Sequence, residues 1–154
     1  MYSFYLILDS NASVYYYELN SVIQFKNKLL NNINLQGTWY VGLCDIQIYK
    51  PKKVEVGHSL WIYSDAVVDT QIGDSMAPLL RRVSISNLKK NWLICEFINV
   101  YYLQLRSNFI ESIKISIKED ISKSFDSFES EFGIASWEPK RDTNTSLTLH
   151  FIKC

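Results

Sequence analysis

This sequence of 154 residues contains few of the side chains that carry most catalytic and metal-binding chemistry. Its three cysteines, Cys44, Cys95 and Cys154, are odd in number and lie far apart, which argues against a disulfide framework. Its two histidines, His58 and His150, form no metal-ligand spacing with each other or with a cysteine. We therefore expect reduced thiols, no metal site and no cofactor.

Groups that could act as a nucleophile or a base are equally scarce. Cys44 or Cys95 could meet His150 in space as a thiol–imidazole pair, but no local motif supports one. The carboxylates at Glu119–Asp120 and between residues 126 and 131 flank a serine-rich stretch that is typical of a solvated loop. The five glycines are isolated, so a phosphate-binding loop is absent as well. We predict that the protein is not an enzyme.

Excess charge of either sign is also missing, because 16 basic side chains balance 16 acidic ones. Neutrality gives no general attraction to nucleic acid or to a membrane surface. Small basic clusters at Lys50–Lys53, Arg81–Arg82 and Lys89–Lys90 are either solvated strand ends or a patch that faces nucleic acid or an acidic partner. The apolar run Met1–Leu8 lacks the charged flank and the length of a signal peptide. We expect an intracellular protein that is not secreted and has no membrane contact.

Aromatic residues, by contrast, are abundant, at 14% with ten tyrosines, and they favour pleated sheets. Short apolar runs between polar turns indicate one all-β domain over residues 1–154, with little helix. Large sheets tend to split into two layers, so we predict a jelly-roll β-sandwich of about eight to ten strands. Leu29–Leu35 is expected to be irregular, and Ile121–Pro139 to hold one short helical turn. The expected strands are Tyr2–Leu8, Val14–Leu19, Val22–Phe25, Thr38–Tyr49, Leu60–Val68, Leu79–Ile85, Trp92–Phe97, Tyr101–Leu105, Ser112–Lys118 and Ser146–Lys153.

The longest of these strands, Thr38–Tyr49, has apolar residues on both faces. Strict alternation would place Trp39, Val41 and Leu43 on one face. The other face would carry Tyr40, Gly42, Cys44, Ile46 and Ile48. One face can meet the core, and the other needs cover from a loop, a second layer or another subunit.

The stretch from Ser64 to Arg81 has the most distinctive pattern in the chain. It predicts a strand end, a polar elbow, a turn at Gly73–Asp74, and a proline, Pro78, that opens the next strand. We hypothesise that Asp65, Asp69 or Asp74 pairs with Arg81 and locks the elbow.

Five segments together resemble one family over nearly the whole chain. They are Ser3–Leu8 with Ser10–Ser13, Leu35–Leu43, Tyr63–Asp74 with Pro78–Arg81, Phe109–Asp120, and Leu147–Phe151. In order and spacing they resemble the penton-like minor capsid proteins of Maverick/Polinton-type DNA viruses and the related adintoviruses. The residues that carry the two main signatures are Gly37, Trp39, Val41, Leu43, Asp65, Gln71, Gly73, Asp74, Pro78, Leu79, Leu80 and Arg81.

The chain departs from that family pattern in a few places. Gln71 lies one position later than expected relative to Asp65, and Asp69–Thr70 stands where the family has a proline. The segment from Lys50 to Ser59 is short where longer relatives carry a large insertion. These differences leave open a divergent or host-adopted copy.

The resemblance implies a single jelly roll that assembles into a homopentamer at the icosahedral vertices of a virion. Its expected neighbour is the double-jelly-roll major capsid protein, and no sequence-specific contact with nucleic acid is expected. Candidate subunit-interface residues are Tyr15, Tyr16, Tyr17, Tyr40, Ile46, Ile48, Tyr101 and Tyr102, because tyrosine is enriched at interfaces. The alternative is a non-catalytic β-sandwich module that binds a glycan, a peptide or another protein. Trp92 and Trp137 are the better candidates for sugar stacking in that case.

Overall fold

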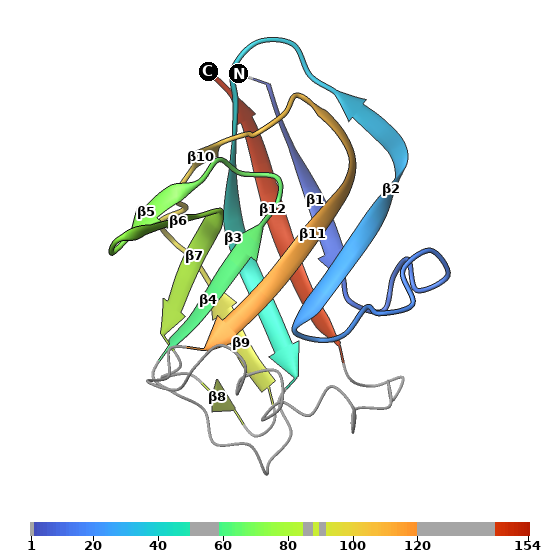
Figure 1. Ribbon diagram of the computed structural model, residues 1–154, viewed down its shortest axis with the longest axis vertical. Coiled ribbons are helices and arrows are strands. Elements are labelled where there is room, and N and C mark those ends of the chain that lie inside the picture. Colours follow the sequence, from blue (N-terminus) through green and yellow to red (C-terminus); the bar gives the residue numbers. More distant parts are fainter. Residues whose placement is uncertain (1, 50–58, 85–87, 90–91, 120–143) are drawn as a thin grey trace.

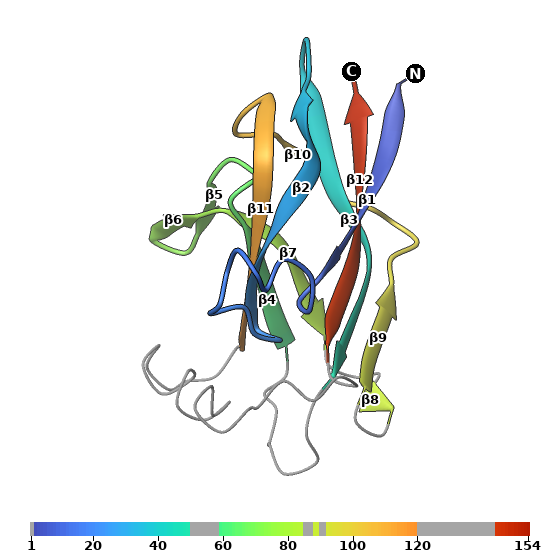
Figure 2. The same cartoon turned by 90° about the vertical axis from the view of Figure 1, so that its right-hand side faces the viewer.

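Two antiparallel sheets pack face to face in the computed structural model, which describes residues 2–49, 59–84, 88–89, 92–119 and 144–154 (Figures 1 and 2). Sheet A has six strands and contains β1 (Ser3–Asp9), β12 (Thr145–Lys153), β3 (Trp39–Tyr49), β9 (Trp92–Glu96), β8 (Leu88–Lys89) and β10 (Leu103–Gln104). Sheet B has four strands, β2 (Gln24–Asn34), β11 (Phe109–Glu119), β4 (Ser59–Ser64) and β7 (Leu79–Ser84). A small hairpin of β5 (Thr70–Ile72) and β6 (Ser75–Ala77) projects from the sandwich (Figure 2).

The eight long strands pair like one long hairpin that has been rolled up. The first strand pairs with the last, β1 with β12, and the next pairs inward are β2 with β11, β3 with β9 and β4 with β7. Successive pairs alternate between the two sheets, and the pairings of β12 with β3 and of β11 with β4 complete each sheet. This order is the jelly roll, so the predicted fold class is confirmed.

The core lies between the two sheets and follows the alternation of the strands. On β11, Ile113, Ile115 and Ile117 face inward and are buried, while Lys114 between them is exposed. On β12, Leu149 and Phe151 face the same core and are fully buried. Burying each such side chain contributes about 1.5–3 kcal/mol, which stabilises the contact between the sheets.

The prediction for β3 was wrong in its second half, because the strand contains a β-bulge. Thr148 pairs with Asp45 and Leu149 pairs with Leu43, so Cys44 is the extra residue. An extra residue shifts the alternation by one position. Ile46 and Ile48 therefore lie in the core, with exposed fractions of 0% and 5%, and do not form a second apolar face.

The outer face of β3 is covered by a loop of the same chain, which is one of the three forms of cover considered from the sequence. A Cβ atom at Gly42 would lie 2.3 Å from Val100 Cγ1 and 2.7 Å from the Tyr101 carbonyl oxygen. Only glycine leaves room for the loop at residues 97–102 to pack this closely on sheet A.

Several strand predictions need correction. Val14–Leu19 forms turns and no strand, because Ser13 has a φ of 60° and its carbonyl accepts hydrogen bonds from the Tyr16 and Tyr17 amides. The stretch predicted as irregular, Leu29–Leu35, belongs to β2 as far as Asn34. The strand from Leu60 ends at Ser64, and only Leu103–Gln104 of Tyr101–Leu105 is strand. The helical turn predicted in Ile121–Pro139 lies outside the described residues.

Candidate functional site

The first family-like signature, residues 37–43, comprises the turn before β3 and the first part of that strand. Gly37 has a φ of +89°, a left-handed conformation that favours glycine, and its carbonyl accepts a hydrogen bond from Asn108. Trp39 is buried, and its indole Nε1–H donates to the Gln36 carbonyl. Val41 and Leu43 are fully buried. Residues of this signature hold the fold and offer no exposed chemistry.

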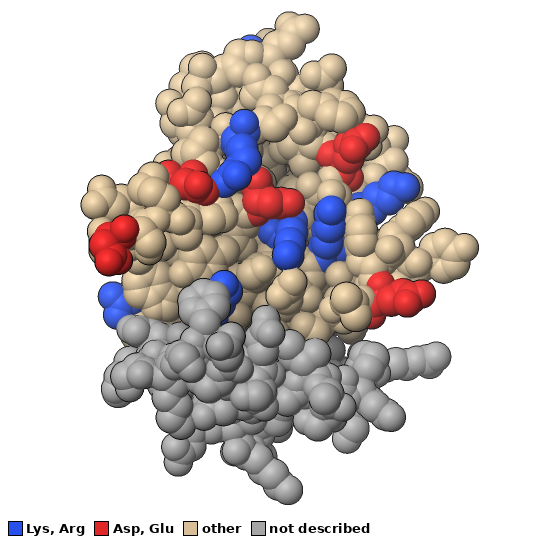
Figure 3. All heavy atoms as spheres, in the orientation of Figure 1, with Lys and Arg blue, Asp and Glu red and all other residues tan. Residues whose placement is uncertain are grey.

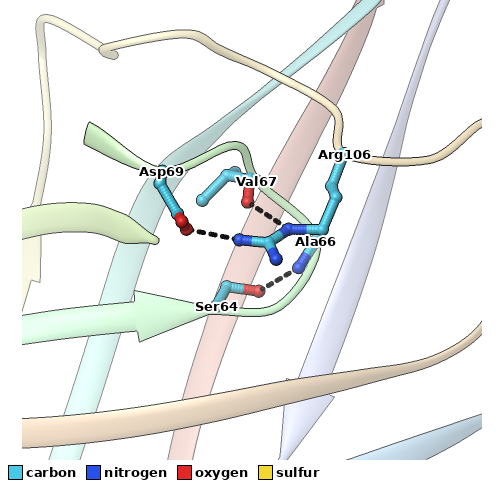
Figure 4. A network of polar contacts seen from close by, with 5 residues as sticks. All are labelled: Ser64, Ala66, Val67, Asp69 and Arg106. Carbon is cyan, nitrogen blue, oxygen red and sulfur yellow. Dashed lines mark hydrogen bonds and ion pairs between the residues drawn. The ribbon is translucent and has the colours of Figure 1, made fainter. Parts of the chain in front are cut away.

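The second signature begins with the elbow after β4, where a polar network forms around Arg106 (Figure 4). The Arg106 guanidinium donates to the Val67 carbonyl and forms an ion pair with Asp69, and its backbone N–H donates to the Ala66 carbonyl. The neighbouring Asp65 carboxylate accepts a hydrogen bond from the Lys114 amide. The elbow is therefore locked by Arg106. The hypothesis that Arg81 pairs with Asp65, Asp69 or Asp74 was wrong, because Arg81 forms no ion pair with a described carboxylate.

The rest of the second signature shapes the hairpin and the start of β7. Gly73 has a φ of +61°, which confirms the predicted turn at Gly73–Asp74, and Gln71 donates to the Gly73 carbonyl. The Pro78 carbonyl accepts a hydrogen bond from the Ser64 amide. Pairing shifts register after this point, and Leu80 is buried while Leu79 is half-buried.

Arg81 lies in a different environment, beside the loop of residues 97–102. Its guanidinium lies 3.7 Å from the centre of the Phe97 ring and 4.7 Å from that of Tyr101, and it donates to the Asn99 carbonyl. Burial lowers the pKa of Arg81, but a guanidinium stays charged at any physiological pH. Arg81 thus fixes a loop that exposes Ile98 almost completely, at 99%, and Tyr101 at 67%. We call Ile98, Tyr101 and Tyr102 the loop patch.

Another exposed apolar surface lies on the loop between β1 and β2. Tyr15 is 88% exposed and Leu19 is 94% exposed, with Val14 and Tyr16 also exposed. Lysines of β2 lie over the neighbouring rings, since Lys28 Nζ is 4.3 Å from the centre of Tyr16. We call Val14, Tyr15, Tyr16 and Leu19 the tyrosine patch.

The two patches are distinct and lie on different elements of the sandwich. The tyrosine patch adjoins β1 and β2, which are the edge strands on one side of sheets A and B. The loop patch extends from Arg81 of β7 over the outer face of β3, and its Tyr102 reaches His150 of β12. Of the predicted interface residues, Tyr15, Tyr16, Tyr101 and Tyr102 are exposed, and Tyr17 and Tyr40 are half-buried. Ile46 and Ile48 are buried in the core and are withdrawn as interface candidates.

His150 lies on the outer face of sheet A between two tyrosines. Its ring stacks on Tyr5 with 4.2 Å between centres, and its Nδ1 is 2.8 Å from the hydroxyl of Tyr102. Burial raises the pKa of Tyr102, with smaller contributions from Cys44 and Tyr5. This stack joins β1, β12 and the loop patch into one aromatic row.

The thiols do not form an activated pair with this histidine. Burial raises the pKa of Cys44, and the adjacent Asp45 carboxylate raises it further. Burial also raises the pKa of Cys95, whose side chain belongs to the core, on the face of sheet A opposite to His150. A raised pKa disfavours the thiolate that a nucleophile requires. Within residues 2–49, 59–84, 92–118 and 144–154, no three His, Cys, Asp or Glu side chains group as metal ligands.

Charged side chains of both signs are interspersed over the face that sheet B presents (Figure 3). Arg82 lies over the Trp61 ring and donates to the Ser59 hydroxyl. The clusters at Lys50–Lys53 and Lys89–Lys90 are outside the side chains that the structure describes. No described helix is long and apolar enough to cross a bilayer.

No protein-family model matches the chain, and no curated protein matches it.

Three residues with important structural contacts carry no signal in the sequence. Asn20, Asn27 and Arg106 hydrogen-bond to backbone atoms that are six to 39 positions away along the chain. Polar side chains in local turns are predictable from neighbouring residues, but such distant partners are set by the fold.

Proposed function

We propose that this protein is a structural capsid protein of the penton class, which forms a ring of five copies at the vertices of a virion. The observation that carries the proposal is the pair of distinct exposed apolar patches on one jelly roll, one on the loop between β1 and β2 and one over the outer face of sheet A. A cyclic ring requires a heterologous interface, in which one surface of each subunit meets a different surface of the next.

The chemistry of both patches suits such an interface. Each combines exposed tyrosine with an exposed aliphatic side chain, Leu19 in the tyrosine patch and Ile98 in the loop patch. Tyrosine buries a large apolar area and keeps a polar end, and it is enriched at protein interfaces. Apolar side chains exposed to this degree in a cluster mark interaction surfaces.

The resemblance to penton-like minor capsid proteins supplies the class of assembly. Jelly rolls occur in capsids, lectins and enzymes, so the fold alone does not assign a function. The signature residues around Trp39 and Arg81 serve the fold, and the exposed tyrosines remain for assembly. The proposed partner is the double-jelly-roll major capsid protein, the proposed location is the virion, and the proposed role is not enzymatic.

Light scattering coupled to size exclusion, followed by negative-stain electron microscopy, tests the proposal. We expect rings of five subunits of 18.0 kDa. Leu19→Lys and Ile98→Lys should each abolish the ring, because each places a charge in a different half of the interface. Met76→Lys is the matched control, since Met76 is exposed on the β5–β6 hairpin and belongs to neither patch (Figure 2). A monomer at high concentration, or a ring that survives both patch substitutions, would contradict the proposal.

A further inference from the structure

The free edge of β1 follows from its pairing with β12. Two hydrogen bonds at the ends of the ladder, from Lys153 N to Tyr2 O and from Ser10 N to Thr145 O, show that even-numbered residues bond to β12. The register between them is unbroken. In an antiparallel ladder hydrogen-bonded and non-hydrogen-bonded pairs alternate, so odd-numbered residues of β1 point their N–H and C=O groups away from β12.

Only one of these odd-numbered residues has its groups satisfied. The side chain of Asn27 accepts a hydrogen bond from the Asp9 amide and donates one to the Asp9 carbonyl, each at 2.9 Å. Ser3, Tyr5 and Ile7 have no partner for these groups among the residues that the structure describes. The edge therefore presents three N–H and three C=O groups between Ser3 and Ile7, a segment that we call the window. Asn27 caps the end of this window at Asp9.

Protective features that edge strands normally have are absent from this window. Ser3–Asp9 contains no proline, no lysine and no bulge, and its outward side chains Tyr5 and Ile7 are 61% and 74% exposed. A flat, apolar edge strand without such features is a template for another strand. At the opposite side of sheet B, β7 carries Arg81 and Arg82 and a register shift.

Apolar side chains beneath the same edge are only partly covered. Phe4 and Leu6 of β1 and Leu29 and Ile33 of β2 are half-buried beside the core. Figure 2 views the molecule from this side, with β1 and β2 as the near edges of the two layers. A strand added to β1 would place its inward side chains over these residues.

We propose that the free edge of β1 pairs with β1 of a second copy of this chain, antiparallel about a two-fold axis at Tyr5. Ser3 would then pair with Ile7 of the second copy, and Tyr5 with Tyr5 of the second copy. All free groups of Ser3, Tyr5 and Ile7 on both copies find partners, because the window is symmetric about Tyr5. Phe4 meets Leu6 of the second copy on the inward side, so the same register covers the half-buried apolar residues.

This pairing differs in symmetry from the proposed ring. A two-fold interface joins like surfaces, whereas the ring joins the tyrosine patch to the loop patch. The two interfaces can coexist, and together they would couple one ring to another.

Native mass spectrometry over a concentration series tests the pairing with Tyr5→Pro against Tyr5→Val. The N–H of Tyr5 faces the free edge, so proline removes a donor needed by the second copy without removing a bond to β12. Valine keeps that donor and serves as the control. Circular dichroism and urea unfolding establish that both variants fold. We expect the wild type to form an assembly with an even number of subunits. Tyr5→Pro should halve the number of subunits, and Tyr5→Val should leave it unchanged.

Other outcomes separate the pairing from the ring. A dimer that Tyr5→Pro converts to a monomer supports the pairing and contradicts the ring. A ring of five that Tyr5→Pro leaves unchanged supports the ring and overturns the pairing. Monomers at every concentration overturn both.

A cross-linking experiment tests the same register if the proline variant does not fold. Tyr5→Cys in a Cys154→Ser background should form an intermolecular disulfide under mild oxidation. The two-fold axis would bring the two Cα atoms to about 5.5 Å, which is within disulfide range. Tyr2→Cys is the control, because the proposed register places residue 2 opposite Leu8 of the second copy, too far from the second copy's residue 2 for a disulfide. Equal cross-linking of both variants, or none of Tyr5→Cys, would overturn the proposed register.

Discussion

β1 and β2 are edge strands on the same side of the sandwich, yet their free edges differ. On β2, the outward N–H groups of three alternate residues donate hydrogen bonds to side chains of the preceding loop. These residues are Gln24, Lys26 and Lys28. Ser21 and Asn20 each satisfy both an N–H and a C=O of β2. On β1 the corresponding groups of three residues have no partner within the described chain, and only those of Asp9 are bonded.

The two strands also differ in charge and regularity. β2 carries Lys26 and Lys28, and its ladder with β11 shifts register between Ile110 and Ser112. β1 has neither feature before Asp9. Charges and irregular register are known means of blocking the addition of another strand. The part of the β2 edge from Gln24 to Lys28 is therefore closed by the fold, whereas the β1 edge from Ser3 to Ile7 is open.

Asn27→Ala should have the largest effect, because this buried side chain closes the end of the β1 window. It bonds to the Asp9 amide and carbonyl and approaches the Ala12 carbonyl. Losing these bonds should lower the free energy of unfolding by about 2 kcal/mol. Urea denaturation measures the change, with Asn32→Ala, an exposed asparagine of the same strand, as the control. Equal stability of the two variants would show that Asn27 does not link β1 to β2.

Asn20→Ala should have a smaller effect on stability and should make the edge of β2 resemble that of β1. Asn20 accepts from the Lys26 amide and donates to the Lys26 and Ala12 carbonyls. We expect a loss of about 1 kcal/mol, since the freed groups can bond to water. Light scattering should show more self-association than in the wild type. Unchanged scattering would mean that the lysines and the register shift suffice to protect β2.

Ile7→Lys should leave stability almost unchanged and give β1 the protection that β2 has. Ile7 is 74% exposed, so the change in the free energy of unfolding should stay within about 0.5 kcal/mol. Sedimentation velocity should show less two-fold association, because a lysine on an edge strand opposes the addition of another strand. Ile7→Thr keeps a β-branched side chain without the charge and is the control. Equal association of Ile7→Lys and Ile7→Thr would show that a charge does not protect the edge of β1.

The sequence predicts those parts of the fold that depend on local pattern. The alternation of Ile113, Ile115 and Ile117 and the turn at Gly73 are visible without a structure, because side-chain period and left-handed turns are local properties. The bulge at Cys44 is not visible, since nothing in an apolar run marks an inserted residue. The prediction of a strand over Val14–Leu19 was wrong. Hydrogen bonds between this loop and β2 outweigh the preference of tyrosine for strands.

The candidate surfaces were less predictable than the fold for the same reason. Exposed tyrosines can be proposed from composition, but buried Ile46 and exposed Ile98 differ only in their tertiary neighbours. The contrast between the β1 and β2 edges depends on hydrogen bonds over distances such as the 18 residues from Asp9 to Asn27.

Amide hydrogen exchange of β1 and β2, resolved by NMR at low and high protein concentration, tests the contrast between the two edges most directly. At low concentration the Tyr5 and Ile7 amides should exchange rapidly, while those of Leu6 and Lys26 are protected by their bonds. At high concentration the Tyr5 and Ile7 amides should gain protection as the second copy binds. Equal protection of the Tyr5 and Lys26 amides at low concentration would contradict the contrast, and exchange at Tyr5 that never slows would contradict the pairing.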